Sequence, residues 1–91
     1  MHADIILKAK QDLASRKVIF DIQLERMYQD EQWGGPEHDD EHTIFDFKSF
    51  INKQLLSVGY PSDNHVSRKA LVNVAALAVA AIESIDRRSS Q

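Results

Sequence analysis

The chain of 91 residues has no cysteine, and it holds only three glycines and two prolines. The absence of cysteine excludes disulfides and thiolate metal sites, and it is typical of the cytoplasmic protein that we expect here. Long apolar runs are also missing. The most apolar stretch, residues 70–82, is interrupted by Asn73 and is too short to span a bilayer. The N-terminus carries charges every few residues and lacks the apolar core of a signal peptide, so no membrane partner is expected.

Basic residues are nearly absent from one part of the chain. Residues 21–46 hold nine acids and one base, Arg26, which gives a net charge of −8. The rest of the chain holds ten bases and five acids, a net charge of +5, so the whole chain has a net charge of −3. An acidic balance disfavours binding to a phosphate backbone, so no direct nucleic-acid partner is expected. Because a core needs no such asymmetry, residues 25–42, which include the only tryptophan, are expected to serve something outside the core.

Apolar residues recur at helical spacing in three segments, about 4–32, 44–57 and 66–87, and no strand pattern or internal repeat appears. Gly34, Gly35 and Pro36 end the first segment, and an acidic loop is expected over 34–43. Thr43 is placed to cap the second helix, and either Asp63 or Ser67 could cap the third. The sequence therefore predicts one all-α domain, a small bundle of about three helices.

The first predicted helix is unusually long for so small a chain. At about 1.5 Å per residue it would exceed about 40 Å, more than a 91-residue monomer can cover. One explanation is a break near residues 15–17; the favoured one is pairing with a second chain, so a homo-oligomer, dimer or higher, is expected. Its apolar positions at helical spacing are Ile6, Ala9, Leu13, Phe20, Leu24 and Met27.

Residues 37–42 contain four carboxylates and two imidazoles. Carboxylates favour Mg²⁺ or Mn²⁺, whereas imidazoles shift the preference toward Zn²⁺, Ni²⁺ or Mn²⁺. His38 and His42 would share one face only if the segment were helical, and Pro36 could begin such a helix. Asp39 and Asp40 are the candidate carboxylate ligands. A solvated loop, helix-capping carboxylates or a partner-facing patch are the alternatives, and they are the more common use of such a segment.

The end of the first helix carries candidate ligand-binding residues. Glu25 and Gln29 share one face, and the more common use of such a pair is ordinary solvated polar surface. Arg26 and Asp30 have the spacing of an exposed ion pair. Trp33 could be a stacking platform for a base, or else a hydrophobic plug over the end of the bundle.

Two lysines in the second predicted helix complete the candidates. Lys48 and Lys53 would neutralise phosphates if they bordered the acidic segment, and otherwise they form a solvated face.

The stretch ERMYQDEQWGGPEHDDEH, followed by RKALVNVAALAVAAIESIDRR, resembles a group of small phage and prophage proteins described as MazG-like, of the all-α nucleoside triphosphate pyrophosphohydrolase class. The resemblance covers residues 22–88. It implies carboxylates in E-x-x-E and E-x-x-D patterns that hold Mg²⁺ for attack of water between the α and β phosphates. Glu83 and Asp86 match E-x-x-D, but Asp46 is the sole acid where E-x-x-E would fall. The loop acids would have to replace the missing ligands, or hydrolysis has been lost, and we favour loss.

The resemblance thus implies a protein that binds a nucleotide or a nucleotide-derived small molecule, with Mg²⁺ or Mn²⁺ as the cofactor if it hydrolyses one. The alternative is a phage accessory or counter-defence protein that docks on a host protein or sequesters a signalling nucleotide. The candidate ligand-binding residues are Glu25, Arg26, Gln29, Asp30, Trp33 and Lys48. The candidate metal ligands are His38, Asp39, Asp40, His42, Glu83 and Asp86.

Overall fold

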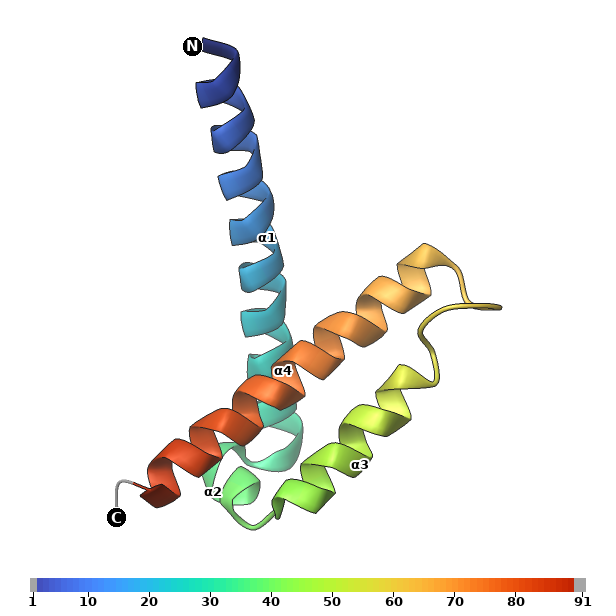
Figure 1. The fold of residues 1–91 in the computed structure, drawn as a ribbon. Helices are drawn as coiled ribbons and strands as arrows, with labels where there is room; N and C mark the ends of the chain where they lie inside the picture. The colour runs from blue at the N-terminus through green and yellow to red at the C-terminus, as the bar shows by residue number, and fades with distance from the viewer. Residues whose placement is uncertain (1, 90–91) are drawn as a thin grey trace.

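The computed structural model describes residues 2–89 and consists of helices joined by short turns (Figure 1). The predicted small all-α bundle is confirmed, since no strand occurs among the described residues. The helices are α1 (His2–Trp33), α2 (Gly35–Asp40), α3 (Ile44–Leu55) and α4 (Asn64–Ser89).

α1 is continuous over 32 residues, so the alternative of a break near residues 15–17 is wrong. No glycine or proline lies inside it to interrupt the hydrogen-bonding pattern. Its C-terminal half crosses α4, whereas its N-terminal half stands clear of the other helices (Figure 1). Every residue from 2 to 20 is exposed. The radius of gyration, 16.1 Å, accordingly exceeds the roughly 12 Å of a compact domain of this length.

The segment 34–43, expected as a loop, contains the short helix α2, so residues 2–89 form four helices rather than about three. Gly34 adopts a φ of 104°, in the left-handed region that glycine reaches without steric cost, and this conformation ends α1. Pro36 then lies in the first turn of α2, where its missing N–H would have no helical partner in any case. The two residue types that end α1 therefore also begin the next helix.

Side-chain caps set the start of α3 and α4. Thr43 and Asp46 form a reciprocal capping box: the Asp46 amide donates to Thr43 Oγ1 at 3.2 Å, and the Thr43 amide donates to Asp46 Oδ2 at 2.9 Å. Asp63 Oδ1 accepts from the Val66 amide at 2.8 Å, so Asp63 rather than Ser67 caps α4.

α3 and α4 lie side by side as an antiparallel hairpin (Figure 1), and the small core is centred on this pair. Phe47 of α3 packs against Ala80 and Ala81 of α4. The alanines of α4 leave little bulk between the helices, which allows a close approach. None of the helices among residues 2–89 contains a stretch long and apolar enough to cross a membrane.

Candidate functional site

A pocket of about 400 Å³ opens between the C-terminal half of α1 and the helices α2, α3 and α4. Three residues that the sequence singled out for ligand binding, Glu25, Gln29 and Trp33, line it together. The full set of lining residues is Glu25, Gln29, Trp33, His38, His42, Phe50, Lys53, Gln54, Asn73 and Leu77. Most of the groups are polar or aromatic, and they come from all four helices.

The α1 wall of the pocket carries a buried carboxamide. Gln29 is only 8% exposed, and its Nε2 donates to Glu25 Oε1 at 3.3 Å, one helical turn earlier. Because burial of an amide is costly unless it is hydrogen-bonded, Glu25 is the group that keeps Gln29 in this position. The shared face predicted from their spacing is therefore present, and it faces the pocket.

Two aromatic rings border the same space. Trp33 is 56% exposed, so it does not act as a buried plug over the end of the bundle. Phe50 of α3 lies edge-on to His42, with ring centroids 5.1 Å apart. Partly exposed rings at the rim of a pocket offer faces on which a flat ligand can stack.

A chain of hydrogen bonds links α3 to α2 along the pocket wall. His42 Nδ1 lies 3.4 Å from Asp46 Oδ2, and His42 Nε2 lies 3.3 Å from His38 Nε2. A neutral His42 that donates from Nδ1 to Asp46 has a bare Nε2, so His38 must donate from its own Nε2. His38 Nδ1 is then an acceptor, and this atom is buried with no hydrogen-bond partner. His38 and His42 are four residues apart, a spacing that places two side chains on one face of a helix. The structure shows the two imidazoles in contact at the end of α2.

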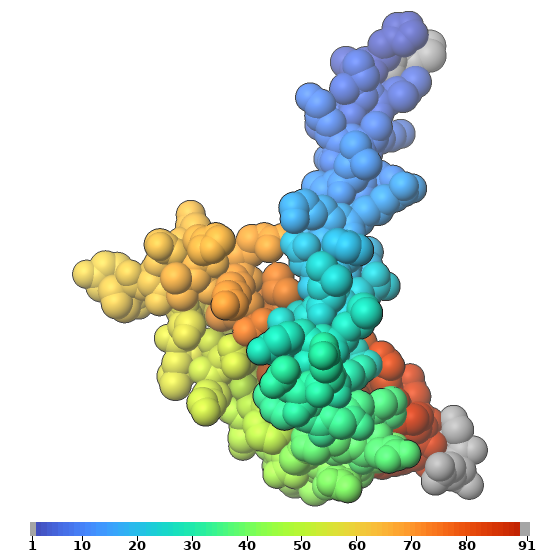
Figure 2. Space-filling view, turned by 180° about the vertical axis from the view of Figure 1, so that it is seen from behind, coloured from blue at the N-terminus to red at the C-terminus, as the bar shows by residue number. Residues whose placement is uncertain are grey.

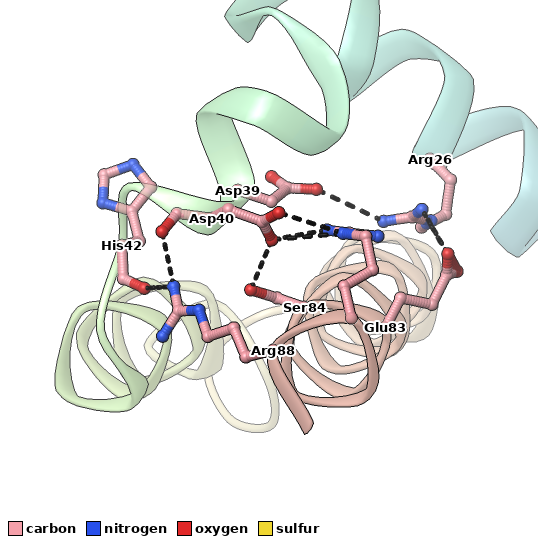
Figure 3. A network of polar contacts seen from close by, with 8 residues as sticks. Arg26, Asp39, Asp40, His42, Glu83, Ser84 and Arg88 are labelled. Carbon is pink, nitrogen blue, oxygen red and sulfur yellow. Dashed lines mark hydrogen bonds and ion pairs between the residues drawn. The ribbon is translucent and has the colours of Figure 1, made fainter. Parts of the chain in front are cut away.

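A second polar cluster holds α2 against α4 (Figure 3). The Asp40 carboxylate accepts from Arg87 Nη2 at 2.8 Å and Nε at 3.1 Å, and from the hydroxyl of the buried Ser84 at 2.8 Å. Arg88 Nη2 donates to the backbone carbonyls of Asp40 and His42, each at 2.6 Å. The bond to Asp40 satisfies a carbonyl in the last turn of α2 that has no helical partner, and the bond to His42 holds the turn that follows.

The same cluster continues to α1 through Arg26. Its guanidinium lies 3.2 Å from Glu83 Oε1 and 3.9 Å from Asp39 Oδ2, which ties α1 to both α4 and α2 (Figure 3). Arg26 was expected to pair with Asp30 on α1 itself. It turns instead to carboxylates that are distant in the sequence, because the fold brings these within reach of its long side chain.

The pKa values of two carboxylates in this cluster, Asp39 and Asp40, are shifted in opposite directions. The hydrogen bonds from Arg87 and Ser84 lower the pKa of Asp40. Burial raises the pKa of Asp39, and the nearby charge of Asp30 raises it further, whereas Arg26 at 3.9 Å only partly opposes both effects. A loose ion pair therefore does not compensate for the loss of solvent around Asp39.

The predicted metal ligands do not gather at one point. Among residues 2–89 no group of three or more histidine, aspartate or glutamate side chains has the arrangement of a metal site. Asp40 and Glu83 are each held by an arginine, and His38 and His42 are turned toward each other. Asp86 also takes part in an interaction. In this arrangement the donors do not fit Mg²⁺ or Mn²⁺, which need several oxygen ligands around one centre.

The remaining candidates divide between the pocket and the surface. Lys48 is exposed and does not line the pocket, whereas Lys53, one and a half turns later on α3, does. Asp30 is half-buried near Asp39, and its backbone carbonyl accepts from the Gly34 amide at 2.9 Å. The pocket residues of α3 and α4 that the sequence did not single out are Phe50, Gln54, Asn73 and Leu77. Their signal in the sequence is indistinguishable from that of ordinary helix positions.

Comparisons with protein-family models, with curated proteins and with solved structures find no match to this chain.

Proposed function

We propose that the pocket between α1 and the three other helices binds a nucleotide or a nucleotide-derived small molecule. The observation that carries this proposal is the composition of one pocket of about 400 Å³, in which aromatic rings, carboxamides and a cation lie together. A pocket of this volume is within the range that holds a small-molecule ligand.

Each kind of group has a part in such a ligand's recognition. Trp33 and Phe50 provide ring faces on which a base can stack, and such stacking depends little on which base is bound. The amides of Gln29 and Gln54 can donate to and accept from the polar edge of a base. Lys53 supplies the positive charge that an anionic phosphate requires.

The proposed activity is binding without metal-dependent hydrolysis. The E-x-x-D residues Glu83 and Asp86 do not line this pocket, and Arg26 already holds Glu83 at 3.2 Å. Asp40 of the acidic segment also lies outside the lining of this pocket and is held by Arg87 and Ser84. Recruiting these acids to a metal would require several charge-assisted hydrogen bonds to break first.

The same pairing weighs against the alternative in which the acidic segment docks on a basic partner. Arg26 and Arg87 of this chain already face Asp39 and Asp40, so part of the charge that the sequence showed is neutralised from within. Less negative charge is left for another protein to recognise.

Titration of the purified protein with common NTPs and dNTPs, followed by Trp33 fluorescence and calorimetry, tests the proposal. Trp33 is the only tryptophan, so a change in its emission reports on the pocket directly. Saturable binding accompanied by a fluorescence change is expected. A fluorescence signal that stays flat across the full set of nucleotides, with no heat of binding, would contradict the proposal. Chromatography of the same mixtures with Mg²⁺ or Mn²⁺ checks hydrolysis, and we expect the nucleotides to remain intact.

Two lysines on α3 form a matched pair of variants. Lys53→Ala removes a cation from the pocket, whereas Lys48→Ala removes the same charge from an exposed position outside it. We expect Lys53→Ala to weaken nucleotide binding about tenfold, the effect of losing roughly 1.4 kcal/mol of charge-assisted contact. Lys48→Ala should leave the Kd unchanged. Equal losses in both variants would indicate non-specific attraction of the phosphates rather than a site.

A further inference from the structure

The outward face of α1 is an apolar surface that the described part of the chain leaves exposed. Ile6, Leu13, Phe20 and Met27 recur every seven residues, and each keeps more than half of its surface exposed. In the view from behind, the N-terminal half of α1 stands apart from the rest of the molecule (Figure 2). Helices without tertiary packing are marginal in water, so a helix of this length needs a surface to pack against. Contiguous apolar surface of this kind marks an interaction site.

We propose that a second copy of this chain covers this face, with the two α1 helices packed antiparallel about a two-fold axis near residues 16 and 17. This inference is independent of the nucleotide pocket, which is built within one chain.

The spacing of the apolar residues is symmetric about that axis. In an antiparallel pair, residues equally far from the axis on the two sides face each other. Six apolar residues of α1 fall into three such pairs, so a single register aligns all of them. The pairs are Ile6 with Met27, Ala9 with Leu24, and Leu13 with Phe20.

The charges at the centre of the helix do not oppose this arrangement. Arg16 and Lys17 would approach their counterparts near the axis, and like charges there would repel each other. Asp12 lies 3.0 Å from Arg16 Nε, and Asp21 lies 3.2 Å from Lys17 Nζ. Each central cation therefore already has a carboxylate within its own helix.

The distribution of charge selects the antiparallel orientation. Within α1, residues 2–20 hold four bases and two acids, a net charge of +2, whereas residues 21–33 hold four acids and one base, a net charge of −3. An antiparallel pair places the basic half of each α1 beside the acidic half of the other. A parallel pair would place the two acidic halves together, at a cost in repulsion.

We call the face formed by the six paired apolar residues of α1 the apolar seam. A groove next to this seam extends the surface that a second copy would cover. It has a volume of about 420 Å³ and lies between α1 and the N-terminal part of α4. Leu24 belongs both to the apolar seam and to the wall of this groove, and Tyr28 and Val72 continue the wall. A helix lying along the seam therefore passes the mouth of the groove.

Molecular mass in solution is the first test. A monomer has a mass of 10.4 kDa, and light scattering during gel filtration should give twice that value. A monomer at about 100 µM, a concentration at which a dimer with a micromolar Kd is almost fully formed, would overturn the proposal.

Cross-linking tests the orientation and register, and the chain offers a cysteine-free background. Single-cysteine proteins Ile6→Cys and Met27→Cys are prepared separately and then mixed under mild oxidation. The antiparallel register predicts a disulfide between the two different variants, since a disulfide needs Cα atoms within about 7 Å. A dimer that links Ile6→Cys only to itself, or that links no combination, would overturn the arrangement.

A charged substitution in the seam tests whether α1 forms the interface. Leu13 is 64% exposed and Gln11 lies on the opposite side of α1, so neither substitution disturbs the interior of a single chain. Leu13→Lys should raise the Kd of the dimer tenfold or more, because an interface that buries an unpaired ammonium is strongly disfavoured. Gln11→Lys is the control with the same added charge. An unchanged dimer in Leu13→Lys would place the interface elsewhere.

Discussion

Asp40 shows how a single residue can join two distant parts of this chain. Its carboxylate accepts hydrogen bonds from Ser84 and Arg87, and its backbone carbonyl accepts from Arg88, all on α4. The sequence indicated a metal ligand or a solvated acid at this position. It could not indicate the pairing, because the partners are more than forty residues away and any of several arginines could have served.

The pKa values of the carboxylates predict how stability depends on pH. Asp40, Asp46 and Asp21 each have a pKa below the ordinary value of 3.8, caused first by hydrogen bonds from Arg87, the Thr43 amide and Arg68, respectively. A depressed pKa contributes stability above the unfolded pKa, and this contribution is lost as the pH falls through the folded value. The raised pKa of Asp39 acts in the opposite direction. From the lowered pKa values of Asp40, Asp46 and Asp21, we expect the free energy of unfolding to decrease as the pH drops below about 4.

Asp40→Asn isolates the contribution of one of these carboxylates, Asp40. The variant should be less stable than the native chain at neutral pH, and its stability should change less as the pH is lowered from about 5 to about 2. Urea denaturation followed by circular dichroism across this range provides the measurement. Asp12→Asn, which removes an exposed carboxylate from an i,i+4 pair on α1, is the control. Parallel pH profiles for Asp40→Asn and the native chain would contradict the assigned role.

Among the features of the individual helices, the positions of the helix ends were the most predictable from the sequence. Thr43 was expected to cap α3, and the structure shows it in a capping box with Asp46. α2 was expected to be a loop, although Pro36 could have begun a helix, because a segment with four acids after two glycines and a proline has the composition of a solvated loop. What makes it a helix is the docking of Asp40 and its carbonyl on α4, which no local pattern contains.

Removing the cap of α3 has a predictable cost. Thr43→Ala leaves the Asp46 amide without its side-chain acceptor, which should lower the free energy of unfolding by about 1 kcal/mol. Ser49→Ala, at an exposed position inside the same helix, should be neutral or slightly stabilising, because alanine has the higher helix propensity. Urea unfolding of both variants at neutral pH provides the comparison. Equal effects would mean that the capping box contributes nothing specific.

For the whole molecule, the extended shape is the dominant feature. The chain measures 50 Å along its longest axis and only 21 Å along its shortest, and half of α1 has no packing within the chain. If a second copy covers α1, folding and association are coupled, and stability depends on protein concentration.

This coupling gives a measurable consequence. The Tm of the native chain should rise with each tenfold increase in protein concentration, whereas the Tm of Leu13→Lys should stay constant once the dimer is lost. Thermal unfolding followed by circular dichroism at several concentrations checks both. A native Tm that is independent of concentration would show that α1 is stable without a partner.

The amino-acid sequence alone was enough to predict α1, α3 and α4, the Thr43 cap of α3 and the apolar face of α1, because these depend on neighbours three to seven residues away. It also placed Glu25, Gln29 and Trp33 on one end of α1, and the structure shows all three on one pocket. Three further features became apparent from the folded chain: Lys53 rather than Lys48 lines the pocket, Arg26 reaches Asp39 and Glu83, and residues 35–40 are helical. These outcomes depend on how α1 and α3 pack on α4. This packing depends on contacts between small and charged side chains that are distant in the sequence. Many of the same side chains would be equally compatible with other arrangements of these helices.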